Sequence, residues 1–493
     1  MQKIHHLRYD LTILGGGSGG LTAARLAASL GARTLLIEKE RLGGECLHSG
    51  CVPSKHLIHV ARLLHQAKQA QQFLRTPLEL DLDSVKIAAS LQQVINQIQE
   101  TERSYVEGVT VRFGTAIFQS PTTLLLDGEL ITSRAFLIAT GSRPAIPALP
   151  GLAEVGYLTN ETVFDLTTLP TSLVVVGGGP VGGELGQAFA RLGVNVTLIQ
   201  RAERLLPRED PDVSRAIEAA LRAEKVQIQT SAEVTKARRL GALKSLTIGH
   251  SEQGGSAEAE EVFLAVGRRS NVEGLQLEAA GVVSNKQGIA VNACLHTSVP
   301  HIFAIGDVIG GYHFSHVAAA QAAVAVRNAL VPWSQKRFET RVVPRCTFTD
   351  PEAAGVGLTE TSARQHYQQI RVVTFPYAEI DRAQTDQETG GFLKLVLAGK
   401  REEIVGAHLV GAQAGELLGE LTLAIQHHLP LSALRDTIHV YPTLSTGIQQ
   451  LAFDAYLQGA EVVRHRRSIQ ALLALRRFLK RETFPSPHGK ETL

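Results

Sequence analysis

The 493-residue sequence has few cysteines, no long apolar run and almost no net charge. Four cysteines are too few for the disulfide framework of a small secreted protein, so a reducing compartment is expected. No stretch approaches the ~18 consecutive apolar residues that cross a bilayer. The first eight residues also lack the apolar core of a signal peptide. A formal net charge of +2 argues against a polyanionic partner, so no nucleic acid is expected. These absences predict a cytoplasmic protein.

The remaining composition is that of a globular protein, with 44% hydrophobic and 19% charged residues. At ~150 residues per domain, the length suggests about three domains.

A glycine-rich loop follows the first apolar strand, residues 10–14, and precedes a helical pattern at residues 21–29. A second strand, residues 34–37, ends in Glu38. Such a loop brings backbone N–H groups to a pyrophosphate at the helix N-terminus, and the acid accepts hydrogen bonds from a ribose. The predicted dinucleotide-binding residues are Gly15, Gly17, Ser18, Gly20 and Glu38.

The same arrangement recurs after a second apolar strand at residues 173–176. Its partner strand, residues 195–199, ends in Gln200 rather than an acid, and Arg201, Arg204 and Arg208 follow. A guanidinium binds the 2′-phosphate of NADPH, and no carboxylate is present to repel that phosphate. The loop therefore favours NADPH, with NADH as the alternative, unless these arginines form only a solvated loop face. The predicted binding residues are Gly177, Gly179, Gly182, Gln200 and Arg201.

Cys46 and Cys51 lie five positions apart in the segment GGECLHSGCVPSK, residues 43–55. A bridge across so short a loop adds little stability, so a redox or soft-metal role explains the pair better. The alternative is two reduced thiols on a helix. Because the pair follows the first of two dinucleotide folds, we expect a redox-active disulfide that works with FAD and a nicotinamide cofactor.

The chain resembles the pyridine nucleotide–disulfide oxidoreductases, the family of dihydrolipoamide dehydrogenase, glutathione reductase and mercuric reductase. Besides the cysteine segment and both glycine loops, the resemblance includes the motifs at residues 139–144, 265–271, 297–307 and 349–360. It extends from about Tyr9 to about Ala460.

The resemblance implies an α/β fold with two Rossmann-like dinucleotide-binding domains and a C-terminal α+β dimerisation domain. The FAD domain would comprise residues 1–149 and 271–340, with the NAD(P) domain, residues 150–270, inserted between them. Residues 341–459 would form the dimerisation domain of a homodimer whose active site the partner subunit completes. A basic tail, residues 460–493, would follow.

The resemblance also implies roles for individual residues. Cys46 would be the exposed interchange thiol and Cys51 the thiol that faces the flavin. Lys55, paired with Glu184, would stabilise negative charge on the reduced flavin, and Asp307 would contact the ribitol. Electrons would pass from NADPH through FAD to the disulfide, then to a metal ion, a disulfide or a quinone-like acceptor. The remaining predicted cofactor contacts are Lys39, Gly44, Thr140, Gly141, Gly267, Arg268 and Gly306.

Two positions depart from the family pattern near the C-terminus. Dihydrolipoamide dehydrogenase and glutathione reductase have an active-site His and Glu where this chain has Tyr441 and Thr446. A phenol with a pKa of about 10 is a poor base at neutral pH, so slow turnover of dithiols is expected. His439 is a candidate substitute, although an imidazole two strand positions away is expected to miss the thiol.

Mercuric reductases also have a Tyr in this region, which places the chain nearer to them. They carry a C-terminal cysteine pair, however, and here no cysteine follows Cys346. The acceptor therefore stays open, and dihydrolipoamide dehydrogenase-like activity is the alternative. His48, His56 and His59 are candidates to assist a metal ion, against the alternative of ordinary surface histidines.

Beyond Gly459 the chain becomes basic, with seven cations and two acids between Glu461 and Glu482. Leu472, Leu475 and Leu479 follow helical spacing, and the pattern predicts a basic amphipathic helix. Such a helix docks on an anionic membrane surface or a partner groove, or folds back on its own acidic body.

Overall fold

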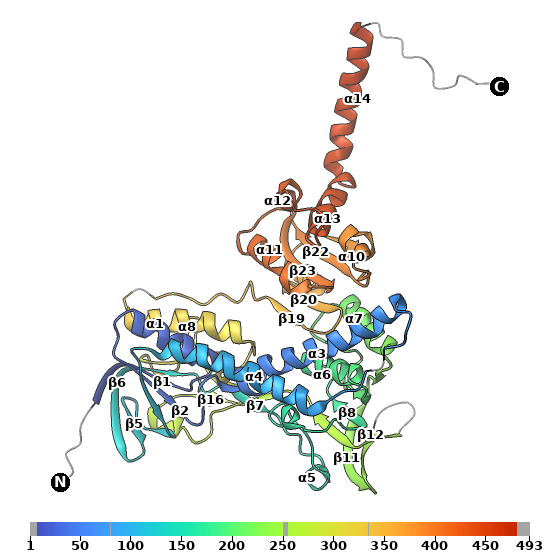
Figure 1. Ribbon diagram of the computed structural model, residues 1–493. Coiled ribbons are helices and arrows are strands. Elements are labelled where there is room, and N and C mark those ends of the chain that lie inside the picture. The colour runs from blue at the N-terminus through green and yellow to red at the C-terminus, as the bar shows by residue number, and fades with distance from the viewer. Residues whose placement is uncertain (1–6, 79, 250–254, 334, 481–493) are drawn as a thin grey trace. The chain divides into compact units, whose positions relative to one another are not determined.

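The computed structural model describes residues 7–78, 80–249, 255–333 and 335–480 (Figure 1). The chain forms two compact units, Met1–Ala353 and Ala354–Leu493. The expectations for residues 1–6 and for the end of the tail, residues 481–493, lie outside the described residues. The side chains of Arg464, Leu479 and Lys480 lie outside the description too. In the described ranges, no helix has both the length and the apolar character needed to cross a membrane.

A seven-stranded sheet forms the core of the first dinucleotide fold. Its strands are β1 (Leu7–Leu14), β2 (Thr34–Glu38), β3 (Thr110–Phe113), β4 (Ala116–Ser120), β5 (Thr123–Leu126), β6 (Glu129–Ile138) and β18 (Ile302–Ala304). The order is β3-β2-β1-β6-β5-β4, and β18 pairs with β6. β1 is parallel to both β2 and β6, so the first predicted strand lies at the centre of the sheet. β18 brings the motif around Asp307 to the sheet that carries the first glycine loop.

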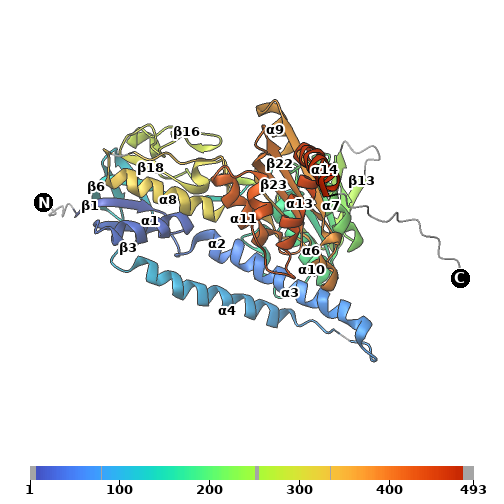
Figure 2. The same ribbon diagram turned by 90° about the horizontal axis from the view of Figure 1, so that it is seen from above.

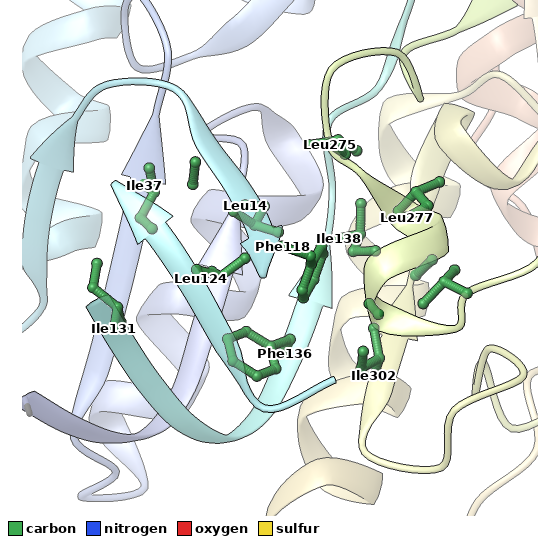
Figure 3. Packing of buried hydrophobic residues seen from close by; sticks show 14 of the residues in the cluster. Leu14, Ile37, Phe118, Leu124, Ile131, Phe136, Ile138, Leu275, Leu277 and Ile302 are labelled. Carbon is green, nitrogen blue, oxygen red and sulfur yellow. The ribbon is translucent and has the colours of Figure 1, made fainter. Parts of the chain in front are cut away.

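Hydrophobic side chains cover both faces of this sheet. On one face α1 (Ser18–Ser29) packs beside α8 (Ser315–Leu330), as Figure 2 shows. Small, fully buried residues such as Ala24 and Ala322 allow the close approach of these helices. On the other face Phe118 and Phe136 pack edge to face, with ring centroids 5.5 Å apart (Figure 3). This packing fixes the ends of the strands that carry the site.

The two cysteines lie on consecutive helices. α2 (Gly44–His48) contains Cys46, and α3 (Cys51–Ala70) begins at Cys51. α4 (Ser84–Arg103) packs beside α3 (Figure 2). Asp83 caps α4, because its carboxylate accepts a hydrogen bond from the backbone N–H of Lys86. The cysteines therefore lie on two successive helices joined by a turn, not on one helix.

The second dinucleotide fold contains a four-stranded sheet in the order β10-β9-β8-β14. Its elements are β8 (Ser172–Val176), α6 (Pro180–Arg191), β9 (Asn195–Ile199), α7 (Pro211–Ala223), β10 (Gln227–Gln229) and β14 (Glu261–Leu264). All paired strands are parallel, and the four β8 residues from Leu173 onward are buried, as expected for a parallel strand covered on both faces. A three-stranded antiparallel sheet adjoins it, formed by β11 (Glu233–Leu240), β12 (Leu243–Gly249) and β13 (Gly255–Ala259).

The second unit contains an antiparallel sheet with β22 between β21 and β23. Its elements are β20 (Glu352–Gly357), α9 (Glu360–His366), β21 (Ile370–Pro376), α10 (Asp381–Thr385), β22 (Phe392–Ala398), β23 (Glu403–Gly411), α11 (Ala414–Gln426), α12 (Leu431–Asp436), α13 (Thr446–Leu457) and α14 (Ala460–Lys480). The predicted tail helix thus corresponds to α14.

The predicted fold class is confirmed: two Rossmann-like folds and a C-terminal α+β domain. The domain boundaries remain a prediction. Short connecting elements complete the chain: β7 (Ser142–Pro144), α5 (Leu152–Val155), β15 (Arg268–Ser270), β16 (Ser284–Asn285), β17 (Gly288–Ile289) and β19 (Arg345–Thr347).

Candidate active site

The first glycine loop connects β1 to α1 and allows three backbone segments to meet. Gly15 has a φ of +103°, and a side chain there would strike the carbonyl oxygen of Ala139. A Cβ on Gly20 would overlap the carbonyl oxygen of Gly15. Glu38 accepts a hydrogen bond from the backbone N–H of Gly16 at 2.6 Å. The carboxylate at the end of β2 therefore lies directly beside the loop, as its predicted role requires.

The second glycine loop repeats this geometry with an uncharged residue. Gly177 has a φ of +113° against the carbonyl oxygen of Ala265, and Gly182 packs on Gly177 as Gly20 does on Gly15. Gln200 Oε1 accepts a hydrogen bond from the backbone N–H of Gly178 at 3.3 Å. Gln200 thus takes the position that Glu38 has in the first loop.

The two arginines nearest to Gln200 differ in their surroundings. Arg201 is 82% exposed, and its guanidinium lies 3.9 Å from Glu233. Arg204 donates hydrogen bonds to the carbonyl oxygens of Pro207 and Glu209, at 3.1 and 3.3 Å. Arg204 therefore fixes the fold of its own loop, whereas Arg201 extends toward solvent.

A cavity of about 1060 Å³ in the first unit connects the first glycine loop with the cysteines. The sequence-predicted residues that line it include Gly15, Gly17, Ser18, Glu38, Lys39, Gly44, Cys46, Cys51, Lys55, Thr140, Gly141, Glu184, Arg268, Gly306 and Asp307. Ligand pockets range from about 300 to 1,000 Å³, so this cavity has room for a dinucleotide. The structure thus brings together residues separated by almost 300 positions.

Cys46 and Cys51 are unbridged thiols that share a proton. The expectation that Cys46 is the exposed thiol is wrong here: Cys46 is half-buried, and Cys51, at the start of α3, is exposed. The pKa of Cys46 is lowered to about 6, because the Cys51 thiol donates a hydrogen bond to its sulfur. Burial opposes this shift, while the hydroxyls of Ser315 and Ser18 reinforce it. The same interaction with Cys46, together with burial, raises the pKa of Cys51. At neutral pH one negative charge therefore resides on the pair, mainly on Cys46.

Lys55 and Glu184 form an ion pair beside the cysteines, with 2.7 Å between Nζ and Oε2. Glu184 is buried on α6, and its second oxygen accepts a hydrogen bond from the backbone N–H of Phe348 at 2.9 Å. The Lys55 ammonium also lies 4.6 Å from the centroid of the Phe348 ring. Burial lowers the pKa of Lys55, but Glu184 outweighs it and the net shift is upward. Lys55 is thus a permanent positive charge at the cavity.

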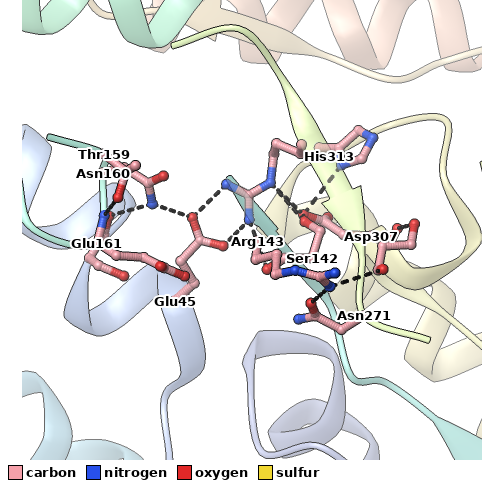
Figure 4. Close-up of polar contacts among 12 residues, drawn as sticks. Glu45, Ser142, Arg143, Thr159, Asn160, Glu161, Asn271, Asp307 and His313 are labelled. Atoms are coloured by element: carbon pink, nitrogen blue, oxygen red, sulfur yellow. Dashed lines mark hydrogen bonds and ion pairs between the residues drawn. The ribbon is translucent and has the colours of Figure 1, made fainter. Parts of the chain in front are cut away.

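A polar network connects α2, the helix that contains Cys46, to the motif at Asp307 (Figure 4). Arg268 contacts both ends: its Nη1 lies 2.5 Å from Glu45 Oε1, and its Nε lies 3.2 Å from Asp307 Oδ2. Ser142 donates to Asp307 at 2.5 Å, and Asn160 donates to Glu45 at 2.6 Å. Glu45 therefore has two partners that fix it next to Cys46.

The charge of Asp307 follows from this network. Burial raises the pKa of its carboxyl, but the His313 ring, whose Nδ1 lies 3.4 Å from Oδ2, and a hydrogen bond from Ser142 outweigh that effect and lower it. Glu45, Asn160 and His313 were not predicted from the sequence. The one available signal was the acidic residue immediately before Cys46.

The predicted histidine cluster is engaged in other contacts. His48 Nε2 lies 2.8 Å from the carbonyl oxygen of Leu42, and His56 Nε2 lies 2.9 Å from Ser90 Oγ. The rings of His56 and His59 have centroids 6.4 Å apart. Among the described residues, no group of three or more His, Cys, Asp or Glu side chains is arranged to bind a metal ion.

In the second unit, Tyr441 and His439 have opposite environments. Tyr441 is 68% exposed and donates a hydrogen bond to Asp381 at 2.8 Å, which raises its pKa. The His439 side chain is buried, with Nδ1 3.0 Å from the carbonyl oxygen of Thr437 and Nε2 3.1 Å from Glu420. The prediction that these residues follow strand geometry is wrong: the segment is irregular, with a cis Tyr441–Pro442 bond. The two side chains consequently do not share a face.

Two dinucleotide loops, a cysteine pair in which the pKa of Cys46 is lowered, and a lysine–glutamate pair are typical of a flavin- and nicotinamide-dependent disulfide oxidoreductase. The chain belongs to the pyridine nucleotide-disulphide oxidoreductase family, whose model matches residues 9–323. The family's dimerisation domain matches residues 343–452 and indicates a homodimer. The family uses FAD with NADH or NADPH.

The similar proteins are named for different substrates. Mercuric reductase from Staphylococcus aureus is 36% identical over 90% of this chain and 82% of that protein. Dihydrolipoyl dehydrogenase from Bacillus subtilis is 34% identical over 91% of this chain and 98% of that protein. A solved copper(II) complex of the HOCl-induced flavoprotein disulfide reductase RclA from Escherichia coli has a TM-score of 0.81 and 28% identity. It covers 90% of this chain and 99% of its own.

Proposed function

We propose that this chain is an FAD-dependent NADPH oxidoreductase that passes electrons through the Cys46–Cys51 pair to a metal ion, a disulfide or a quinone-like acceptor. The observation that carries this proposal is the lowered pKa of Cys46 in a cavity that continues to the first glycine loop. When bound, FAD supplies the two-electron chemistry that connects a nicotinamide hydride with a disulfide. The small number of cysteines supports a cytoplasmic location.

The residues present fit the cofactor. The N-terminus of α1, with Gly15, Gly17 and Ser18, offers backbone N–H groups to a pyrophosphate. Glu38 accepts hydrogen bonds from a ribose, and ionised Asp307 does so from the ribitol. Lys55 would place a positive charge beside the bound ring, because its ammonium is at the cavity and its pKa is raised.

The cysteine pair can reduce an acceptor disulfide without an external base. The Cys46 thiolate attacks one acceptor sulfur, the acceptor S–S bond breaks, and a mixed disulfide forms. Cys51 then loses its proton to the departing thiolate and attacks Cys46, which restores the Cys46–Cys51 bond and releases the second thiolate. The proton of Cys51 thus protonates the departing thiolate, and this step needs no histidine. The same thiols suit a soft ion such as Hg(II), and the copper(II) complex of the RclA relative supports testing Cu(II).

Arg201 supports the choice of NADPH. It extends into solvent next to the second glycine loop, whereas the uncharged Gln200 presents no carboxylate to a 2′-phosphate.

Dihydrolipoamide dehydrogenase activity is the second candidate, favoured by the nearly full-length match to the B. subtilis enzyme. The hydrogen-bonded phenol of Tyr441 in place of the family's histidine argues against it. In the homodimer, the partner subunit would complete the active site.

The experiment is an NADPH-oxidation screen of the purified full-length protein against Hg(II), Cu(II), disulfides and quinones. We expect a flavin spectrum that NADPH bleaches under anaerobic conditions. Cys46→Ser should abolish reduction of disulfides and metal ions while leaving direct reduction of a quinone dye. A protein without flavin, or a Cys46→Ser variant that reduces every acceptor as well as the wild type, would refute the proposal.

A further inference from the structure

The helix α14 has a composition unlike that of the rest of the chain. Between residues 462 and 480 it carries six cations and no acidic residue, together with Ile469, Leu472, Leu473, Leu475 and Phe478. The family's dimerisation model ends at residue 452, before this helix begins. The matched family domains therefore do not include α14.

Every described side chain from 466 to 478 is exposed. Leu472 is 64% exposed and Phe478 is 80% exposed, although both are large apolar residues. Figure 1 shows α14 running away from the sheet of its own unit. The apolar side chains are thus not packed against the described residues of their own unit, so of the two alternatives the helix folded back on its own body is not observed there.

Two arginines lie opposite a stripe of apolar side chains on α14. Leu472, Leu475 and Phe478 are spaced by three residues, so they form one stripe along α14. Arg466 and Arg477 are eleven positions apart, which is about three turns, and they project opposite the stripe. Arg467 lies eleven positions before Phe478, on the side of the stripe, and its long side chain can extend from there toward the polar layer. This arrangement suits a flat interface between an apolar and an anionic layer.

We propose that α14 lies on the surface of an anionic phospholipid bilayer, with the stripe toward the acyl chains and the guanidinium groups on lipid phosphates. The alternative of pairing with a second copy of α14 is disfavoured. The stretch contains no acid to face the six cations, so two such helices would repel each other. A nucleic acid would bind the cations but would leave the leucine stripe exposed to water. A lipid surface, in contrast, provides acyl chains for the apolar stripe and phosphates for the cations.

Sedimentation with lipid vesicles tests this proposal, with the full-length FAD-loaded protein. We expect binding at low salt to vesicles of phosphatidylcholine in which about one third of the lipid is phosphatidylglycerol, because cations are attracted to an anionic leaflet. Binding should weaken as salt rises and should be much weaker on pure phosphatidylcholine, because the anionic charge supplies much of the attraction.

Two double variants separate the contributions. Arg476→Gln with Arg477→Gln should weaken binding roughly 25-fold, at about fivefold for each cation. Leu472→Ser with Leu475→Ser should weaken it at least about tenfold through lost apolar burial. The matched control is Lys400→Gln with Arg401→Gln, which removes the same charge from an exposed turn of the same unit and should leave binding unchanged.

All variants should keep the flavin spectrum and NADPH oxidation, which shows that they fold and that docking is separate from the redox function. Absence of binding to anionic vesicles at low salt would overturn the proposal. Equal loss in the Lys400 and Arg401 control would overturn it too, because net charge and not α14 would then account for binding. Concentration-dependent self-association that the leucine variant abolishes, without vesicle binding, would instead assign α14 to a second copy.

Discussion

Lys55 on α3 and Glu184 on α6 are 129 positions apart in the sequence, yet Nζ and Oε2 lie 2.7 Å apart. The pair connects the helix that begins at Cys51 with the helix that follows the second glycine loop. It therefore joins the thiols and the nucleotide loop through one contact. Glu184 is buried and depends on Lys55 for charge compensation.

Replacing Lys55 with Met should slow flavin reduction by NADPH and lower stability by about 1–2 kcal/mol. This is less than the 3–5 kcal/mol typical of breaking a buried pair, because the Lys55 side chain is 36% exposed. Stopped-flow bleaching and urea unfolding of the FAD-loaded protein measure the two effects. In Glu184→Gln the amide oxygen can still accept from Phe348, so the loss of stability should be smaller. A larger loss in Glu184→Gln than in Lys55→Met would contradict this account.

The lowered pKa of Cys46 predicts an unusual pH dependence of alkylation. In the reduced protein the thiolate is present above pH 6 and protonated below it, so the iodoacetamide rate should rise through pH 6 and level off near pH 7. An ordinary cysteine would show its midpoint near 8.5. Cys51→Ala removes the donated hydrogen bond and should move the midpoint upward. Peptide mass spectrometry identifies the alkylated residue, and a midpoint near 8.5 in the wild type would disprove the shift.

Arg201→Gln should raise the KM for NADPH roughly tenfold and leave that for NADH nearly unchanged, because only NADPH has a 2′-phosphate. Steady-state kcat/KM for both nucleotides measures this difference. Arg204→Gln is the matched control: it breaks loop contacts to Pro207 and Glu209, so both nucleotides should be affected alike. Equal effects of Arg201→Gln on NADPH and NADH would exclude Arg201 as the phosphate ligand.

Tyr441→Phe should change dihydrolipoamide turnover by less than about twofold. The hydrogen bond to Asp381 raises the pKa of the phenol, so Tyr441 stays protonated and removes no proton from a dithiol at neutral pH. The rate is measured as NAD(P)⁺ reduction by dihydrolipoamide at about pH 7.5, which is far below the pKa of a phenol. Tyr441→His, which introduces the residue that dihydrolipoamide dehydrogenase has at this position, should raise it. Loss of turnover in Tyr441→Phe would show that the phenol takes part after all.

Local residue patterns predict the features that depend on neighbouring residues. The two glycine loops, the strands that flank them and the terminal residues Glu38 and Gln200 follow a local spacing, and the structure contains each of them. The contact between Arg268 and Glu45 spans 223 positions, and that between Asn160 and Glu45 spans 115. Local periodicity carries no information on such pairs. Only the folded chain reveals that Glu45 has partners.

The same limit explains the errors in the C-terminal part. Strand geometry was assumed for His439 and Tyr441, but the segment is irregular, and burial separates the two side chains. The helix α14 was predicted from its spacing. The helical pattern does not show whether other parts of the chain pack on its leucines, and the structure leaves them exposed.

Glu38 and Gln200 accept a hydrogen bond from the equivalent glycine of their loops, one as a carboxylate and one as an amide. The backbone of the loop needs only an oxygen at this place, and both side chains supply it. The conformation of the turn therefore does not depend on the charge of this side chain. An exchange of acid for amide at this position changes the charge beside the loop and keeps the hydrogen bond that holds the turn.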